Sequence, residues 1–254
     1  MAEGNVLSAA PNCRAELIED DQLLLLTLSN GRSNAITPSL LDEIGRTLDD
    51  VEAMGVVRGV VVQGTGSTFS KGFDVDVIEN YPTATAHRRD LLLGNDVCSR
   101  ISASRVPWIA AINGHCLGAG LEIALACHIR LGIEGARYGL PELSRGLLPG
   151  LGGASRLTKV VGRSKALEMI LGGSLIDSAE AHRIGLINRL FPKSSFSDAV
   201  LAFARNVVSV EPELTAEVMQ LTSAAEMTGH EDGIVETVER VLHRWKPRGP
   251  GEVL

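Results

Sequence analysis

The sequence predicts an α/β protein in which a largely parallel sheet is followed by a helical C-terminal region. Up to Pro149, apolar runs of strand length alternate with segments of helical periodicity. Strand segments such as "GVVVQG" and "WIAAI" are apolar at consecutive positions, which is typical of strands covered on both faces. Beyond Pro149 the strand signal fades, apart from "LINRLF", and helical patterns dominate. With 44% apolar residues, the 254-residue chain can bury a substantial core.

The first predicted elements are a strand that begins at Leu23 and the helix that follows it. Thr37 is a suitable N-cap for this helix, and Pro38 stands at the first helical position, where its missing N–H is tolerated. A second buried strand is expected at residues 59–64, followed by the loop "GTGSTFSKGFD". These segments form one predicted strand–helix–strand unit.

Further units follow the same pattern. We expect a helix near residues 88–102, a strand at residues 108–112 and, after an "NG" turn, a helix that begins near Leu117. Another strand is expected at residues 129–133. The repeated strand and helix units favour a largely parallel sheet.

We place the start of the helical region at residue 196, which divides the chain into a core of residues 1–195 and a C-terminal region of residues 196–254. The C-terminal region has more apolar helical positions than one small α/β core needs. Examples are Val200, Phe203, Val207, Leu214, Val218 and Leu221. We therefore expect this region to contribute to assembly.

Charge and cysteine content exclude several classes of protein. The net charge of −7 lacks the basic footprint of a nucleic-acid binder and would repel an anionic membrane surface. The cysteines, Cys13, Cys98, Cys116 and Cys127, include no C-x-x-C pair, and three lie in apolar stretches. They are typical of reduced, structural thiols. Because the N-terminal stretch also lacks the features of a signal peptide, we expect a cytoplasmic protein without membrane or nucleic-acid partners.

Two glycine-rich loops come close to nucleotide-binding motifs. The loop "GTGSTFSKG" has Lys71 before Gly72, whereas a phosphate-binding loop needs glycine, then lysine, then serine or threonine. The loop "PGLGGAS" has Ser155 where a dinucleotide-binding motif needs a third small residue, and no strand ends before it. The sequence therefore predicts no nucleotide site.

A metal site and a hydrolase triad are also unsupported. His115, Cys116, Cys127 and His128 are possible metal ligands by residue type. Adjacent residues of a regular element point to different sides, so Cys127 and His128 would not face one ion, and buried packing explains them better. The sequence contains no G-x-S-x-G motif.

Glu122 is the only formally charged residue between Trp108 and Cys127. A buried charge costs several kcal/mol unless it is paired or neutralised. We therefore expect Glu122 to be a functional carboxylate that lowers the stability of the protein, so that Glu122→Met would raise the melting temperature. The alternative is a glutamate that favours a helix N-terminus. In the same segment, the amides of Ala119 and Gly120 fall in the first helical turn and are free to bind an anion.

Two further segments carry candidate groups. In "FSKGFD", Gly72 permits an unusual backbone angle that would let the amide of Phe73 point into a cleft, although a plain turn explains this segment equally well. In "GLPELSRG", Glu142 follows Pro141 and lies twenty residues beyond Glu122. Taken alone, Glu142 could be an ordinary exposed glutamate.

Together, "FSKGFD", "AAINGHCLGAGLEIAL" and "YGLPELSRGLLPGLGGASRL" resemble the enoyl-CoA hydratase/isomerase, or crotonase, superfamily in order and spacing. The resemblance extends from about Leu23 to Leu190. It implies a spiral of repeated β-β-α turns and C-terminal helices that build a homotrimer or a dimer of trimers. The ending "VERVLHRWKPRG" matches the family only loosely.

The resemblance also implies a site and an activity. The backbone amides of Phe73 and Ala119 correspond to the oxyanion hole for a thioester carbonyl, and Glu122 and Glu142 correspond to the acid/base pair of enoyl-CoA hydratases. We assign Glu122 as the base that acts on water and Glu142 as the proton donor, with roles reversed for dehydration. Neither a metal nor a redox cofactor is implied, since coenzyme A enters as part of the substrate.

Other positions correspond to contacts with substrate or coenzyme A in relatives. They are Ser33, Ala35, Lys71, Asp74, Val75 and Gly150. Phe73 replaces a frequent alanine, which predicts a narrower or reshaped pocket, and the helix near residues 81–93 is expected to line the acyl pocket. Ala119 replaces the usual glycine but keeps its amide.

Three functions remain open: an enoyl-CoA hydratase or dehydratase, a double-bond isomerase that uses one glutamate, and a non-catalytic acyl-CoA-binding subunit. The acyl chain and the choice between coenzyme A and a carrier-protein thioester also remain open. The hydratase is the interpretation that uses both Glu122 and Glu142.

Overall fold

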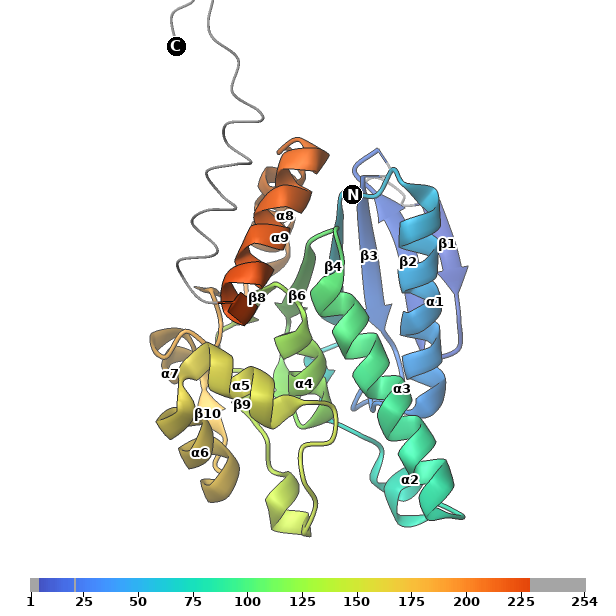
Figure 1. The fold of residues 1–254 in the computed structure, drawn as a ribbon. Helices are drawn as coiled ribbons and strands as arrows, with labels where there is room; N and C mark the ends of the chain where they lie inside the picture. Colours follow the sequence, from blue (N-terminus) through green and yellow to red (C-terminus); the bar gives the residue numbers. More distant parts are fainter. Residues whose placement is uncertain (1–4, 21, 229–254) are drawn as a thin grey trace, which may run out of the picture. The chain divides into compact units, whose positions relative to one another are not determined.

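The structure, a computed structural model, describes residues 5–20 and 22–228. The chain divides into two compact units, Met1–Val210 and Glu211–Leu254. The first unit contains all the predicted site residues and the strands drawn in Figure 1. The C-terminal motif at residues 238–249 lies outside the described residues.

The larger sheet has seven strands in the order β1-β2-β3-β4-β6-β8-β11. The first three strands pair antiparallel, and every later pair is parallel. The strands are β1 (Asn5–Ala9), β2 (Cys13–Ile18), β3 (Leu23–Leu28), β4 (Gly59–Gly64), β6 (Trp108–Ile112), β8 (Ile129–Ile133) and β11 (Arg189–Phe191). In register, Val60 of β4 is paired with Leu24 on one side and Trp108 on the other.

A smaller sheet has four strands in the order β10-β9-β7-β5. Its strands are β5 (Thr68–Ser70), β7 (His115–Leu117), β9 (Arg137–Gly139) and β10 (Ile176–Asp177). The pairs β5–β7 and β7–β9 are parallel, whereas β9–β10 is antiparallel. Three strands of this sheet each follow a strand of the larger sheet in the chain: β5 follows β4, β7 follows β6, and β9 follows β8.

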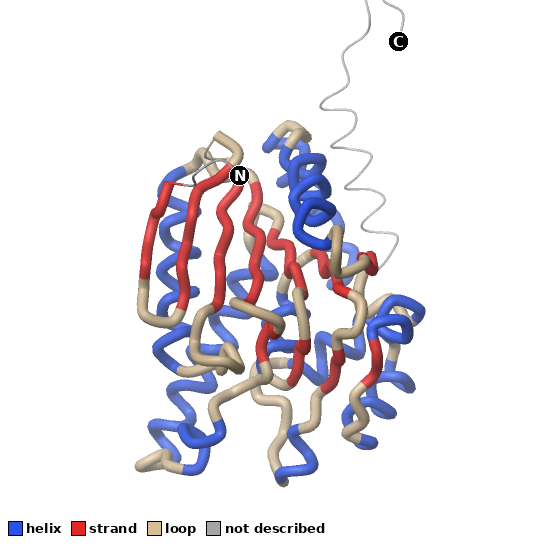
Figure 2. Tube along the Cα trace, turned by 180° about the vertical axis from the view of Figure 1, so that it is seen from behind, coloured by secondary structure: helices blue, strands red, loops and turns tan. Residues whose placement is uncertain are grey.

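Helices complete the turns and cover the sheets. In the first unit they are α1 (Pro38–Met54), α2 (Val75–Glu79), α3 (Ala84–Ala103), α4 (Ala119–Ala126), the 3₁₀ helix η1 (Glu142–Arg145), α5 (Gly153–Val161), α6 (Arg163–Gly172), α7 (Ser178–Arg183) and α8 (Phe196–Val208). The second unit contains α9 (Pro212–Thr228). Figure 1 shows α1 and α3 in front of the larger sheet, and Figure 2, turned by 180°, shows the strands in front of them.

The chain therefore repeats one pattern: a strand in the larger sheet, a strand in the smaller sheet, then a helix. The segments β4-β5-α2-α3 and β6-β7-α4 are two such turns, and β8-β9 followed by η1 and α5 begins the next. This arrangement confirms the α/β class and the spiral of β-β-α turns that the resemblance implies.

Most predicted elements are present, with shifted ends. The strand from Leu23 and the helix capped by Thr37 are confirmed, and the Oγ1 of Thr37 accepts from the amide of Leu40 at 3.2 Å. The helix expected near residue 88 begins at Ala84, because Thr83 caps it. The helix expected near Leu117 begins at Ala119, because residues 115–117 pair as strand β7.

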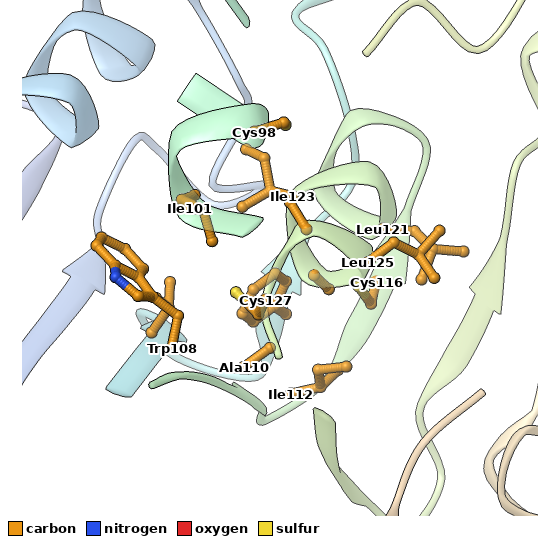
Figure 3. Close-up of a cluster of buried hydrophobic side chains, with 14 of the residues drawn as sticks. Cys98, Ile101, Trp108, Ala110, Ile112, Cys116, Leu121, Ile123, Leu125 and Cys127 are labelled. Carbon is orange, nitrogen blue, oxygen red and sulfur yellow. The ribbon is translucent and has the colours of Figure 1, made fainter. Parts of the chain in front are cut away.

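The main hydrophobic core lies between the larger sheet and α1, α3 and α4, and it extends to the smaller sheet. Figure 3 shows part of it, in which side chains of β6 (Trp108, Ala110 and Ile112), of α3 (Cys98 and Ile101) and of α4 belong to one buried cluster. All four cysteines are free and buried. Burial raises the pKa of the Cys13, Cys98 and Cys127 thiols to about 12, so these side chains are neutral packing groups.

A second hydrophobic cluster explains α8. Val200 of α8 is buried against Leu23, Val61 and Ile109 of the larger sheet, and Phe203 and Val207 pack beside it. These three α8 positions therefore belong to the first unit's own core, whereas Leu214 and Val218 of α9 are exposed. The division at residue 195 into a thioester-binding core and an assembly region stays a prediction. Among the described helices, none has the length and apolar character needed to cross a membrane.

Candidate active site

Two loops lie side by side at the carboxyl ends of β3 and β5. The amide of Lys71 donates to the carbonyl oxygen of Ser33 at 2.9 Å, and Ile36 forms an isolated parallel bridge with Phe73. The amide of Asp74 then donates to the carbonyl oxygen of Ile36 at 2.8 Å. The structure therefore brings together Ser33 and Lys71, which were predicted to lie near coenzyme A.

This bridge decides where the amide of Phe73 points. The carbonyl oxygen of Gly72 accepts from the amide of Ile36 at 2.9 Å. In a planar trans peptide the C=O and the N–H point in opposite directions, so the N–H of Phe73 points away from Ile36. Gly72 has a φ of 104°, a conformation that favours glycine. The interpretation of Gly72 as the residue that turns this amide is consistent with that geometry.

The second amide belongs to Ala119, the first residue of α4. The first N–H groups of a helix have no intrahelical acceptor. A Cβ on Gly72 would lie 3.4 Å from the nitrogen of Ala119, so the two loops are in backbone contact. In the described part of the chain, no acceptor pairs with the amide of Phe73 or of Ala119. Both predicted donors are therefore available to a ligand.

Gly118, and not Ala119, takes the unusual backbone conformation at the start of α4. Its φ is 52° and its ψ is −133°, whereas Ala119 is not among the residues with positive φ. The alanine at position 119 is therefore compatible with the backbone, because the sharp turn occurs one residue earlier. Its small side chain is 4% exposed and packs in the main core.

Ser70 contacts both the Gly72 loop and the first turn of α4. Its side chain is fully buried, and its Oγ accepts from the amide of Gly72 at 3.2 Å. A Cβ on Gly120 would lie 2.6 Å from the Cβ of Ser70, so the first turn of α4 rests directly on this serine. Ser70 was not singled out from the sequence, because a small polar residue at the end of a strand carries no pattern of its own.

Glu122 lies one turn further along α4 and is 2% exposed. Its Oε1 accepts from the amide of Leu151 at 2.8 Å and from the amide of Gly153 at 2.7 Å. The expectation that this carboxyl group stands alone among apolar residues is therefore wrong, because the loop before α5 supplies two donors. Periodicity within α4 could not reveal partners 29 and 31 residues away.

Burial is the main reason that the pKa of Glu122 rises, to about 7. The amides of Gly153 and Leu151 oppose this rise in pKa, as does the positive charge of Arg156, whereas the nearby Glu142 adds to it. Near neutral pH, Glu122 can therefore exist in both protonation states. This is the property that general acid/base catalysis needs.

The loop that holds Glu122 has little room for other side chains. A Cβ on Gly153 would lie 2.7 Å from Oε1 of Glu122. Arg156 of α5 donates from Nη1 to the carbonyl oxygen of Leu151 at 2.7 Å. The glycine-rich "PGLGGAS" loop therefore binds a carboxylate of its own chain with its amides.

Glu142 begins η1 and is partly exposed. Burial raises the pKa of its carboxyl group, and its Oε2 is a buried oxygen without a hydrogen-bond partner in the described structure. A Cβ on Gly118 would lie 3.1 Å from Oε1 of Glu142. Glu142 therefore faces the loop that carries the Ala119 amide, and it is more than an ordinary surface glutamate.

The remaining predicted residues have definite places. Asp74 caps α2, and its Oδ1 accepts from the amide of Asp76 at 3.0 Å, while Val75 is the first residue of that helix. The carbonyl oxygen of Ala35 accepts from the side chain of Asn30 at 2.7 Å. Gly150 directly precedes Leu151, whose amide donates to Glu122. Their contacts with a ligand stay predictions.

In chemical terms, the site combines two free amides with two carboxyl groups of raised pKa. The amides can stabilise a developing negative charge on a carbonyl oxygen, and the carboxyl groups can exchange protons near neutral pH. Among the described residues, no group of three or more His, Cys, Asp or Glu side chains is arranged to hold a metal ion.

The chain is similar in sequence to proteins of one known family. The enoyl-CoA hydratase/isomerase family model matches residues 19–240. A probable enoyl-CoA hydratase of Bacillus subtilis (strain 168) is 33% identical, over 93% of this chain and 98% of the relative. Another probable enoyl-CoA hydratase, of Mycobacterium tuberculosis, is 29% identical over 87% of this chain and 84% of the relative.

Solved structures agree with the fold. An enoyl-CoA hydratase from Geobacillus kaustophilus HTA426 has a TM-score of 0.88 at 26% identity, covering 94% of this chain and 91% of that one. Pseudomonas aeruginosa DspI has a TM-score of 0.87 at 27% identity, covering 96% and 98%. A putative enoyl-CoA hydratase from Thermobifida fusca, solved in complex with CoA, has a TM-score of 0.83 at 26% identity, covering 91% and 92%.

Proposed function

Because the chain belongs to the enoyl-CoA hydratase/isomerase family, we propose that it adds water across the 2,3 double bond of an enoyl thioester, or removes it in the reverse direction. The observation that carries this proposal is the pairing of Glu122 and Glu142 with the free amides of Phe73 and Ala119. A double-bond isomerisation needs only one carboxyl group to move the proton, whereas hydration uses both.

The geometry supports the following steps. The amides of Phe73 and Ala119 bind the thioester oxygen and stabilise the enolate that forms when water attacks C3. Glu122, held by the amides of Leu151 and Gly153, takes a proton from the attacking water as the C–O bond forms. Glu142 delivers its proton to C2, which restores the thioester carbonyl. The product is a 3-hydroxyacyl thioester, and the proton from water remains on the enzyme until the pair exchanges it.

The hydrogen bonds of the two carboxyl groups are compatible with these roles of base and proton donor. Glu122 accepts two N–H hydrogen bonds, which favour its charged form, whereas the Oε2 of Glu142 accepts none. The Oε2 of Glu142 is therefore free of other partners when it delivers its proton. The two groups influence each other, so they are expected to titrate as a coupled pair.

Coenzyme A is the proposed carrier of the acyl chain. The Thermobifida fusca relative contains CoA, and the loops of Ser33 and Lys71 lie beside the Phe73 amide. Arg32 and Lys71 are exposed and can offset the phosphates of the carrier.

We further propose cytoplasmic location and a homotrimer or dimer of trimers without a metal or redox cofactor. Light scattering that showed a stable, active monomer would contradict the assembly.

Mass spectrometry after incubation with 2-enoyl-CoA substrates of several chain lengths tests the activity. Hydration adds the mass of one water, isomerisation conserves the mass, and a non-catalytic subunit leaves the substrate unchanged. The same incubation with enoyl thioesters of a carrier protein decides between the two carriers. An unchanged mass with every substrate, although the protein is folded, would contradict the proposed function.

A further inference from the structure

Asn95 lies on α3, outside the segments that carry the family resemblance, and it connects this helix to the loop that holds Glu122. Its Nδ2 donates to the carbonyl oxygen of Leu91 in the same helix at 2.8 Å. The same nitrogen donates to the carbonyl oxygen of Gly150 at 2.8 Å, 55 residues further along the chain. One side-chain amide therefore anchors the start of the loop to α3.

The peptide that Asn95 binds is the one that holds Glu122. The carbonyl oxygen of Gly150 and the N–H of Leu151 belong to the same planar trans peptide and point in opposite directions. Asn95 binds the oxygen on one side, and Oε1 of Glu122 accepts the N–H on the other. The orientation of this peptide plane is therefore determined from both sides.

The surrounding contacts do not make Asn95 redundant. Arg156 binds the next two carbonyl oxygens, those of Leu151 through Nη1 and of Gly152 through its backbone amide. Neither bond restrains the plane between Gly150 and Leu151, and glycine at position 150 adds no side chain to restrain it. The loop also rests on α3, because a Cβ on Gly94 would lie 2.5 Å from Cδ2 of Leu151.

We propose that Asn95 is a positioning residue, which holds the Gly150–Leu151 peptide so that its N–H stays on the carboxylate of Glu122. The two hydrogen bonds that join Asn95 to Glu122 through the Gly150–Leu151 peptide form a relay, which follows from the geometry alone. Its role in catalysis rests on the proposed function of Glu122.

The charged and titratable groups around Glu122 come from three elements: Glu142 of η1, Arg156 of α5 and Cys98 of α3. Burial raises the pKa of the Cys98 thiol to about 12, so it is neutral near pH 7. Asn95→Leu changes none of these charges, and leucine is close to asparagine in size. A change in the titration of Glu122 in this variant would therefore report the loss of the amide hydrogen bond.

The test is an NMR titration of the full chain labelled with ¹³C in the glutamate carboxyl groups, in which Glu122→Gln assigns the resonance of Glu122. Asn95→Leu is expected to raise the midpoint of Glu122 by about one pH unit, because a donor to the charged form is lost. The matched control is Asn113→Leu. The Nδ2 of Asn113 also joins two carbonyl oxygens, those of Gly64 at 2.6 Å and Gly66 at 2.9 Å, but does not contact the Glu122 loop. In Asn113→Leu, the titration midpoint of Glu122 is expected to match that of the wild type.

An unchanged midpoint in folded Asn95→Leu would overturn the proposal, as would an equal shift in Asn113→Leu. If Asn95→Leu does not fold, Asn95→Ala takes its place, and the wild-type protein offers a second measurement. There, the amide proton of Leu151 should follow the titration of Glu122, and an amide that does not respond would also overturn the relay.

Turnover separates this inference from the proposed function. In an active enzyme, Asn95→Leu is expected to lower kcat roughly tenfold with little change in KM, since it acts through Glu122. If the wild type hydrates no enoyl thioester while the midpoint of Glu122 still shifts, the relay stands and the proposed function fails. If hydration is present and neither kcat nor the midpoint changes, the relay fails and the function stands.

Discussion

Glu122 and Glu142 have the same side chain and face the same site, but they are supported in different ways. Glu122 lies on an eight-residue buried helix, and its Oε1 accepts two backbone hydrogen bonds. Glu142 lies in a four-residue 3₁₀ helix, is partly exposed, and has a buried Oε2 without a partner. Burial raises the pKa of both carboxyl groups, to about 7 for Glu122; the amides of Gly153 and Leu151 oppose this rise for Glu122, and the backbone amide of Glu142 itself opposes it for Glu142.

The difference shows that two carboxyl groups at one site need not be interchangeable. A carboxylate with two fixed donors is held in one place and can accept a proton without losing its support. A carboxyl group with an unpartnered buried oxygen is less constrained by hydrogen bonds. The fixed position of Glu122 suits a base that orients the attacking water, and the assignment of Glu142 as the acid in the direction of hydration follows the family resemblance.

The largest expected effect is on turnover. Glu122→Gln and Glu142→Gln should each lower kcat for hydration by roughly a hundredfold or more with little change in thioester binding, because each removes one proton-transfer group. The double variant should be little slower than the slower single variant, because the pair acts as a unit. Steady-state kinetics and a binding titration with a saturated acyl-CoA check this. Near wild-type turnover in one variant would remove that residue from the mechanism.

A second prediction concerns the pH dependence of stability. The pKa of Glu122 rises from 4.5 to about 7 on folding, so the folded protein retains this proton to higher pH than the unfolded chain. The resulting stabilisation is complete below pH 4.5 and is lost as the pH rises through about 7. Relative to the wild type, Glu122→Gln should therefore gain roughly 3 kcal/mol in free energy of unfolding over this range.

Urea denaturation of both proteins between pH 4.5 and pH 8 measures this difference. Glu142→Gln is the comparison variant, because its carboxyl group is less buried. A free-energy difference between wild type and Glu122→Gln that stays constant with pH would contradict the raised pKa of Glu122.

A third prediction replaces each carboxyl group with an apolar one. At pH 5, Glu122→Met should lower the free energy of unfolding by about 2 kcal/mol, because the buried amides of Leu151 and Gly153 lose their acceptor. This reverses the expectation drawn from the sequence. Glu142→Met should change stability by less than about 1 kcal/mol, because its buried oxygen has no donor to strand. Equal losses in both variants would remove the distinction between the two glutamates.

The smallest expected effect comes from moving the carboxylate of Glu122 without removing it. In Gly153→Ala, the new methyl group would lie 2.7 Å from Oε1, so the carboxyl group must shift and kcat should fall about tenfold. Gly172→Ala is the matched control, since its Cβ would meet only the Oγ of Ser174 at 3.8 Å. Both kcat values are measured with the same enoyl-CoA. A Gly153→Ala enzyme as fast as the control would show that the position of Glu122 tolerates this shift.

The sequence alone determined the α/β class, the strands at residues 59–64, 108–112 and 129–133, and the helix capped by Thr37. These elements have apolar runs or capping residues, which are local signals. The short strands of the smaller sheet, such as β7, were missed, because three residues show no periodicity. The antiparallel strands β1 and β2 were missed as well; β1 pairs only with β2, and none of its positions is fully buried, so it carries no apolar pattern.

The candidate site divides in the same way. The sequence singled out Glu122, Glu142, Phe73 and Ala119 through the family resemblance and through one charge in an apolar segment. Only the tertiary structure decided what surrounds Glu122: the amides of the loop before α5, and Asn95 behind that loop. The physical reason is that backbone hydrogen bonds carry no sequence signature. Any residue can supply the N–H, so its partner becomes known only when the chain is folded.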